Sequence, residues 1–147
     1  MIDDLSDEQE AAWCAEQRQQ VILHFQYEGL AIPAVEELPV WHVAPIVSVW
    51  AVEDASDTSR RWWAVSGDLP TDHIVRGPKS SPRQALHDIG LRWRDGAAKW
   101  ADGQSAEEWG LRNRDNEKEL APLLAARAEH FLDIAADDSN WEDAPSA

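Results

Sequence analysis

The sequence has few of the features that mark an exported, membrane-spanning or cysteine-dependent protein. Cys14 is its single cysteine, so the chain forms no internal disulfide and no zinc site built from several cysteines. The first residues contain no basic, apolar leader, and no run approaches the roughly 20 apolar residues that cross a bilayer. We therefore expect a cytoplasmic protein that does not associate with membranes.

Motifs of hydrolases and nucleotide-binding proteins are also missing. Ser66 precedes Gly67, but Ala64 occupies the place where a nucleophile elbow needs a glycine. Gly67 lies apart from the other glycines, which excludes a phosphate-binding loop and a dinucleotide fingerprint. We assign no catalytic residue and no cofactor, and we favour a binding protein over an enzyme.

Positive charge is scarce, since 13 Lys and Arg stand against 28 Asp and Glu and give a net charge of −15. Residues 1–16 and 128–147 each hold six acids and no Lys or Arg, whereas residues 60–99 hold eight bases and four acids. Arg60 and Arg61 precede Trp62 and Trp63, and Trp93 lies between Arg92 and Arg94, a mixture of basic and aromatic residues that is compatible with stacking on nucleic-acid bases. The overall negative charge opposes phosphate binding. We expect these tryptophans in the core, and acidic ends that cover the basic middle or meet a partner.

Apolar residues are numerous enough for one well-formed core. They make up 44% of the 147 residues, and nine of them are Trp. A chain of this length buries roughly two thirds of its unfolded surface when it folds. We expect a single globular α+β domain over residues 1–136 and an acidic tail over residues 137–147, mobile unless Trp141 docks.

Helix signals are clear at the amino terminus. Ser6 and Gln9 have the spacing of a capping box, and Gly29 provides a left-handed stop, so we predict a helix over about residues 7–28. The stretch that follows is punctuated by prolines, and we do not expect it to be helical.

The rest of the chain predicts the order α-β-β-(β)-α-α, a small antiparallel sheet of two or three strands packed by three or four helices. We predict one helix that begins at Pro82 and another that begins near Ser105, which Pro122 should kink or split. The predicted strands cover residues 46–52 and 60–66 with a loop at 53–59 between them, and a short third strand covers residues 73–76.

The turn after the paired tryptophans is the most specific local pattern. Ser66, Asp68, Asp72 and His73 offer oxygen and nitrogen atoms that suit a ligand or metal site. The same composition is typical of a structural turn, in which Asp and Ser bind nearby backbone and Gly supplies a positive φ, and we favour that interpretation.

Histidines elsewhere are weaker candidates for a site. His42, His73 and His87 lie in different predicted elements, and none has the one-turn spacing of a helical metal motif. His24 and His130 lie on predicted helices and carry less signal still.

The acidic ends support the leading functional hypothesis, a small protein-binding module such as an antagonist or immunity-type inhibitor that covers a basic site on its partner. The alternative is an enzyme or a small-ligand or metal-binding protein with its site at residues 66–73. The oligomeric state stays open. The candidate partner-binding residues are Glu8, Glu10, Asp137, Asp138 and Trp141.

Residues 62–72 also carry a resemblance. The string Trp-Trp-x-x-Ser-Gly-Asp-x-Pro-Thr-Asp, with the preceding Val- and Trp-rich strand and the later helix that contains Trp93, resembles a small bacterial family of domains of unknown function. The resemblance covers most of the chain, from the first helix to the last. It implies no activity, cofactor or catalytic residue, and it makes the turn a family feature of either structural or functional origin.

Overall fold

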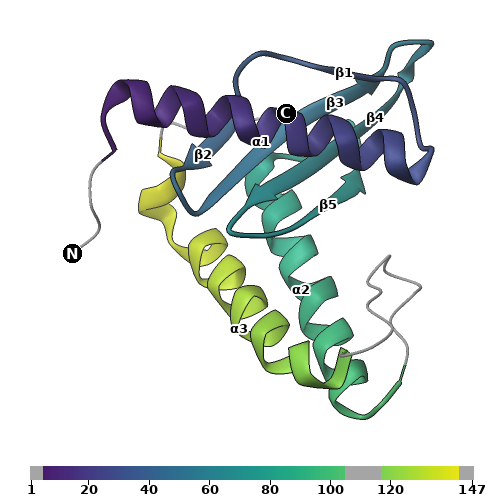
Figure 1. The fold of residues 1–147 in the computed structure, drawn as a ribbon, viewed down its shortest axis with the longest axis vertical. Coiled ribbons are helices and arrows are strands. Elements are labelled where there is room, and N and C mark those ends of the chain that lie inside the picture. The colour runs from purple at the N-terminus through teal and green to yellow at the C-terminus, as the bar shows by residue number, and fades with distance from the viewer. Residues whose placement is uncertain (1–4, 105–116, 143–147) are drawn as a thin grey trace. The chain divides into compact units, whose positions relative to one another are not determined.

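The computed structural model describes residues 5–104 and 117–142 (Figure 1). Over these residues the protein is α+β, with three α-helices and a five-stranded antiparallel sheet. The chain divides into two compact units, one with the described residues up to Ala85 and the other with those from Leu86 onward. Within the described ranges, no helix has the length and apolarity that a bilayer crossing requires.

Helix α1, Asp7–Glu28, has the predicted bounds. The Ser6 hydroxyl accepts the backbone N–H of Gln9 at 3.1 Å, and the Gln9 side chain accepts the backbone N–H of Ser6 at 2.9 Å, so the capping box is complete. At the other end Gly29 adopts a left-handed conformation with φ 65°. Local side-chain chemistry therefore sets both ends of this helix.

The sheet has more strands than the sequence predicted. The structure adds β1, Pro33–Val35, and β2, Trp41–Val43, in the proline-punctuated stretch. Both are three residues long, and both pair with the same edge of β3. Pro33 stands at the first position of an edge strand, where its missing N–H costs the least. These strands form because β3 supplies their hydrogen-bond partners, which local propensity does not reveal.

The central hairpin is longer than predicted. Strand β3, Val47–Asp54, pairs with β4, Asp57–Gly67, so most of the predicted loop at residues 53–59 belongs to the strands. Asp54 accepts the hydroxyl of Ser56 at 2.7 Å and its backbone N–H at 3.0 Å, which tightens the turn. Strand β5, Leu69–Val75, follows β4 and is also longer than the predicted residues 73–76.

The core of the first unit lies between α1 and one face of the sheet (Figure 1). Phe25 is fully buried and meets Trp62 edge to face, with ring centroids 5.2 Å apart. Trp62 and Trp63 are buried, as expected, and the guanidinium of Arg60 lies over the Trp62 ring. The buried cluster consists of Val21, Phe25, Val35, Trp50, Val52, Trp62 and Ala64.

Gly67 owes its place in the β4–β5 turn to a close backbone approach. A Cβ atom on this residue would overlap the carbonyl group of Ile46, whose oxygen accepts the N–H of Asp68 at 3.0 Å. The positive φ that we expected a glycine to supply here is absent, because Gly29 and Gly103 are the glycines with positive φ in the described part of the chain. Close packing of two chain segments therefore requires this glycine.

The second unit contains most of α2, Pro82–Ala101, with α3, Glu117–Ala136, and a short 3₁₀ helix η2, Asp138–Trp141. Pro82 begins α2, as predicted. Helices α2 and α3 meet where Gly90 lies against Leu132 and where Trp93 stacks on Phe131 with ring centroids 5.0 Å apart. Residues 105–116, where we predicted the start of the last helix, lie outside the described residues. Helix α3 continues through Pro122, so of the two predicted effects, a kink or a split, the split is wrong.

Candidate functional site

The turn residues that the sequence singled out have different environments. Ser66 is buried, and its hydroxyl donates to the side-chain oxygen of Gln17 on α1. Its carbonyl accepts the hydroxyl of Ser48 at 2.8 Å, and that hydroxyl accepts the indole N–H of Trp50 at 2.8 Å. Ser66 thus belongs to a buried polar network that joins α1 to β3 and β4. Such a network fixes the position of the helix on the sheet.

Asp68 is exposed, whereas Asp72 and His73 lie deeper, on β5. Asp72 is 6% exposed, and its Oδ1 accepts the backbone N–H of His73 at 2.8 Å. The same oxygen lies 4.0 Å from Nδ1 of His73. Two of the four predicted site residues, Asp72 and His73, are therefore close to each other, whereas Ser66 belongs to the buried network and Asp68 is exposed.

The ring of His73 contacts a residue that the sequence analysis ranked low. Nε2 of His24 and Nδ1 of His73 are 2.8 Å apart, and the two ring centroids are 5.0 Å apart. One imidazole donates and the other accepts, as a pair of neutral rings can do. The contact joins residues 49 positions apart, which no local pattern reports.

The fold brings these histidines together through two regular elements. His24 follows the buried Val21 by three residues and precedes Phe25, so it lies at the margin of the buried stripe of α1. His73 is the cross-strand partner of Ala64, whose side chain belongs to the core beneath α1. Phe25 packs against both rings, with centroid distances of 5.6 Å and 5.4 Å. Both rings are thus held by rigid structure.

Electrostatics at His24 favour its neutral state. Burial lowers the pKa of His24, and the neighbouring His73 lowers it further, while Asp72 acts in the opposite direction. At neutral pH the His24 imidazole therefore keeps a nitrogen lone pair for a hydrogen bond or a metal. Asp72 contributes a carboxylate, so the arrangement combines two imidazoles and one carboxylate.

Two other histidines lie beside carboxylates of their own. Nε2 of His42 lies 3.4 Å from a carboxylate oxygen of Glu10, and Nδ1 of His87 lies 3.2 Å from Asp88. Among the described residues, the group of possible metal ligands that includes His73 contains His24 and Asp72 and does not contain His42. In the sequence, the spacing of His24 from Val21 and Phe25 was the one sign that it faces the fold. The same spacing is typical of a histidine that packs in the core and binds nothing.

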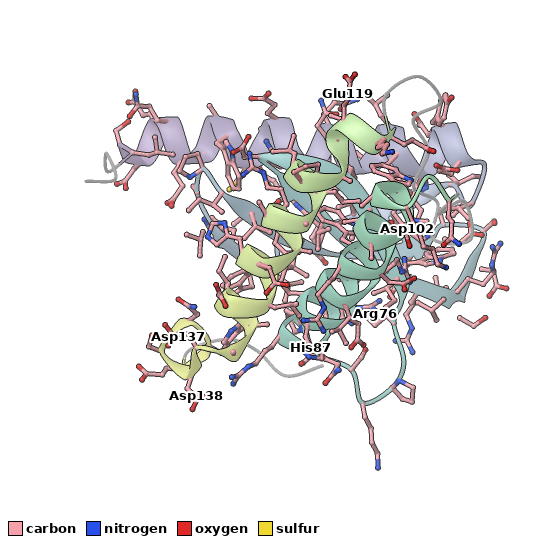
Figure 2. The ribbon with its side chains drawn as sticks, turned by 90° about the horizontal axis from the view of Figure 1, so that it is seen from below. Arg76, His87, Asp102, Glu119, Asp137 and Asp138 are labelled. Atoms are coloured by element: carbon pink, nitrogen blue, oxygen red, sulfur yellow. The ribbon has the colours of Figure 1, made fainter. Side chains whose placement is uncertain are left out.

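The candidate partner-binding residues at the carboxyl end belong to η2 and its N-cap. Figure 2 shows Asp137 and Asp138 there, beyond the end of α3. Asp137 caps η2 by accepting the N–H of Ser139 at 3.0 Å and its hydroxyl at 2.7 Å. Trp141 is 8% exposed, and its indole N–H donates to the carbonyl of Ile134 at 3.0 Å. Trp141 thus docks on α3, and the part of the expected tail that the structure describes is folded. Asp138 is exposed.

The acids of the amino-terminal helix have a different setting. Glu8 is fully on the surface, and Glu10 is half-exposed beside His42. The single base of α1, Arg18, donates to the carbonyls of Val35 at 2.8 Å and Glu36 at 3.0 Å. Its charge is turned toward β1, so the outward side of α1 presents no Lys or Arg.

Comparison with known proteins gives one match. A family model described as a Domain of unknown function (DUF4826) matches residues 7–141, which confirms the expected kind of family. No curated protein and no solved structure matches the chain.

Proposed function

The chain belongs to the family Domain of unknown function (DUF4826), and from this premise we propose that it is a protein-binding module whose helix α1 recognises a basic surface on a partner protein. The observation that carries the proposal is the outward face of α1. Opposite the buried stripe, the helical period places Glu8, Glu16, Leu23 and Tyr27 on one broad face.

This face combines negative charge with exposed apolar surface. Leu23 is 47% exposed and Tyr27 is 88% exposed, while Glu8 and Glu16 are on the surface. Tyr is among the residues that contribute most binding energy when an interface covers them. Acids around such an anchor attract a basic partner and disfavour an acidic one. A partner with a basic patch beside an apolar one fits both features.

The net charge of the chain supports the same partner class. A charge of −15 accelerates the encounter with a basic protein and makes the association sensitive to salt. A protein that covers a basic site on another protein acts as its antagonist when that site is functional. The proposal relies on α1 because Asp137 and Trp141 are engaged within the last turn.

The test begins with the partner itself. We would purify the tagged chain from its native cells at low and moderate salt, identify the stoichiometric co-purifying protein, and reconstitute the complex from purified components. The proposal requires a basic partner whose Kd for the chain increases with salt. A partner that is acidic, or a Kd that does not depend on salt, would contradict it.

Variants then locate the surface. The double variant Glu8→Lys/Glu16→Lys should weaken binding by roughly tenfold or more, and Tyr27→Ala should weaken it with a smaller change in salt dependence. Glu119→Lys/Asp133→Lys, at two exposed positions of α3, is the control with the same change in net charge. Equal affinity of the double variant and the unmodified chain would refute the assignment to α1.

A further inference from the structure

We propose that His24, Asp72 and His73 form a binding site for one divalent transition-metal ion of the Zn²⁺ class. The ligand atoms of these residues all lie within 4.8 Å of one another. His24 comes from α1, and the other two come from β5. None of these three ligands belongs to the protein-binding face of α1, so the two proposals rest on different residues.

The distances are close to those of a metal centre. Zn²⁺ binds imidazole nitrogen at about 2.0–2.1 Å, so two nitrogens at tetrahedral angles lie about 3.3 Å apart. Nε2 of His24 and Nδ1 of His73 lie 2.8 Å apart, and Oδ1 of Asp72 lies 4.0 Å from Nδ1 of His73. Binding therefore needs the two nitrogens to separate by about 0.5 Å and the carboxylate to approach by somewhat more. Small side-chain rotations provide such shifts.

The donor set selects the class of metal. Two imidazoles and one carboxylate suit Zn²⁺ and its first-row neighbours, whereas Ca²⁺ and Mg²⁺ prefer a shell of oxygen atoms. Three protein ligands leave at least one position of a tetrahedral ion for water or a substrate. Both histidines keep part of their surface exposed, so this position is accessible from solvent.

The surroundings hold the ligands in place. Asp72 is buried, and its Oδ1 is oriented by the backbone N–H of His73. The Phe25 ring packs against both imidazoles. Outer contacts of this kind orient ligands before the ion arrives and raise the affinity of a site.

A hydrogen bond between the two imidazoles explains their contact without any metal. The two interpretations differ in the role of Asp72, because the hydrogen bond needs only the histidines, whereas the metal site also needs the carboxylate. They differ as well in their response to added metal. Both differences can be measured.

The experiment uses the full chain, stripped with a chelator and titrated with zinc chloride and with cobalt chloride. We expect one Zn²⁺ per chain by calorimetry, a higher unfolding temperature when Zn²⁺ is present, and Co²⁺ absorption bands typical of tetrahedral nitrogen and oxygen ligands. Asp72→Asn should weaken Zn²⁺ binding at least tenfold, and His24→Gln or His73→Gln should abolish it. Circular dichroism checks that each variant folds.

His42→Gln and His87→Gln are matched controls, since each of these histidines also lies beside a carboxylate. Both should bind Zn²⁺ as the unmodified chain does. The proposal is overturned if the chain binds no Zn²⁺, if several ions bind weakly to its acidic surface, or if binding persists in Asp72→Asn and His24→Gln. Should His24→Gln fail to fold, Asp72→Asn together with the Co²⁺ spectrum decides the question. The variant Glu8→Lys/Glu16→Lys should keep Zn²⁺ binding, so the two proposals fail separately.

Discussion

Substitution of Gly67 by Ala should destabilise the protein strongly, although alanine is a small residue. The added Cβ would overlap the backbone carbonyl of Ile46, and backbone atoms yield much less readily than the end of a flexible side chain. The same carbonyl oxygen accepts the N–H of Asp68 at 3.0 Å. Relief of the overlap therefore moves β4 away from the start of β3 and strains or breaks this hydrogen bond.

The expected loss of unfolding free energy combines two contributions. Overpacking in a well-packed region costs about 1–3 kcal/mol. Loss of one backbone hydrogen bond adds about 1 kcal/mol. We therefore expect Gly67→Ala to lower the free energy of unfolding by about 2–4 kcal/mol, a large share of the stability of a small protein.

Two other glycines serve as controls. No atom lies within 4 Å of a Cβ built on Gly77, and its φ is outside the left-handed region, so Gly77→Ala should change stability by about 0.5 kcal/mol or less, or raise it. Gly29 also has open space, but its φ of 65° makes alanine cost about 1–2 kcal/mol. From the most stable variant to the least stable, we expect Gly77→Ala, then Gly29→Ala, then Gly67→Ala.

The assay is urea unfolding at 25 °C, followed by tryptophan fluorescence, with the midpoint and slope fitted for each variant. Trp50, Trp62 and Trp63 are buried in the first unit and report on its unfolding. If Gly67→Ala were as stable as Gly77→Ala, with the same slope, the close approach of residues 46 and 67 would not constrain the fold. The explanation of this glycine would then be wrong.

Three further predictions concern the core and the titrating groups of the first unit. Phe25→Ala should cost about 3–5 kcal/mol in urea unfolding because the ring is fully buried, whereas Leu23→Ala, on the exposed side of the same helix, should cost less than about 1 kcal/mol. Burial lowers the pKa of His24, so below pH 6.5 this residue is protonated more readily in the unfolded chain than in the folded one. The free energy of unfolding should therefore decrease as the pH falls, by less than about 1.4 kcal/mol per pH unit. This slope should be smaller in His24→Gln. Hydrogen bonds from the hydroxyl and N–H of Ser56 lower the pKa of Asp54. The stability that Asp54 contributes is therefore present above its ordinary pKa of 3.8 and is lost as the pH falls further. Asp54→Asn should lower the unfolding temperature at pH 7, and the difference in unfolding temperature from the unmodified chain should become smaller in acid.

Local sequence signals determined both ends of α1 and the start of α2. Ser6 and Gln9 satisfy the first backbone N–H groups of α1, and Gly29 reverses the chain at its end, so the predicted bounds are those observed. Pro82 begins α2 for a similar reason, since the hydroxyl of Ser81 accepts the N–H of Gln84 at 3.1 Å. The residues in these contacts are three or four positions apart, so both partners can be recognised in the same short stretch of sequence.

Tertiary structure decided the edges of the sheet and the identity of the candidate metal ligands. Strands β1 and β2 are too short to have a pattern of their own and exist because β3 offers an unpaired edge. Asp72 and His73 could be selected from the sequence, but His24 could not, because its partner is 49 residues away. A histidine at the margin of an apolar helix face has the same local pattern whether it contacts solvent, the core or another imidazole. Only the packing of α1 on β5 distinguishes these cases, because hydrogen bonds and metal coordination depend on distances between atoms that the fold brings together.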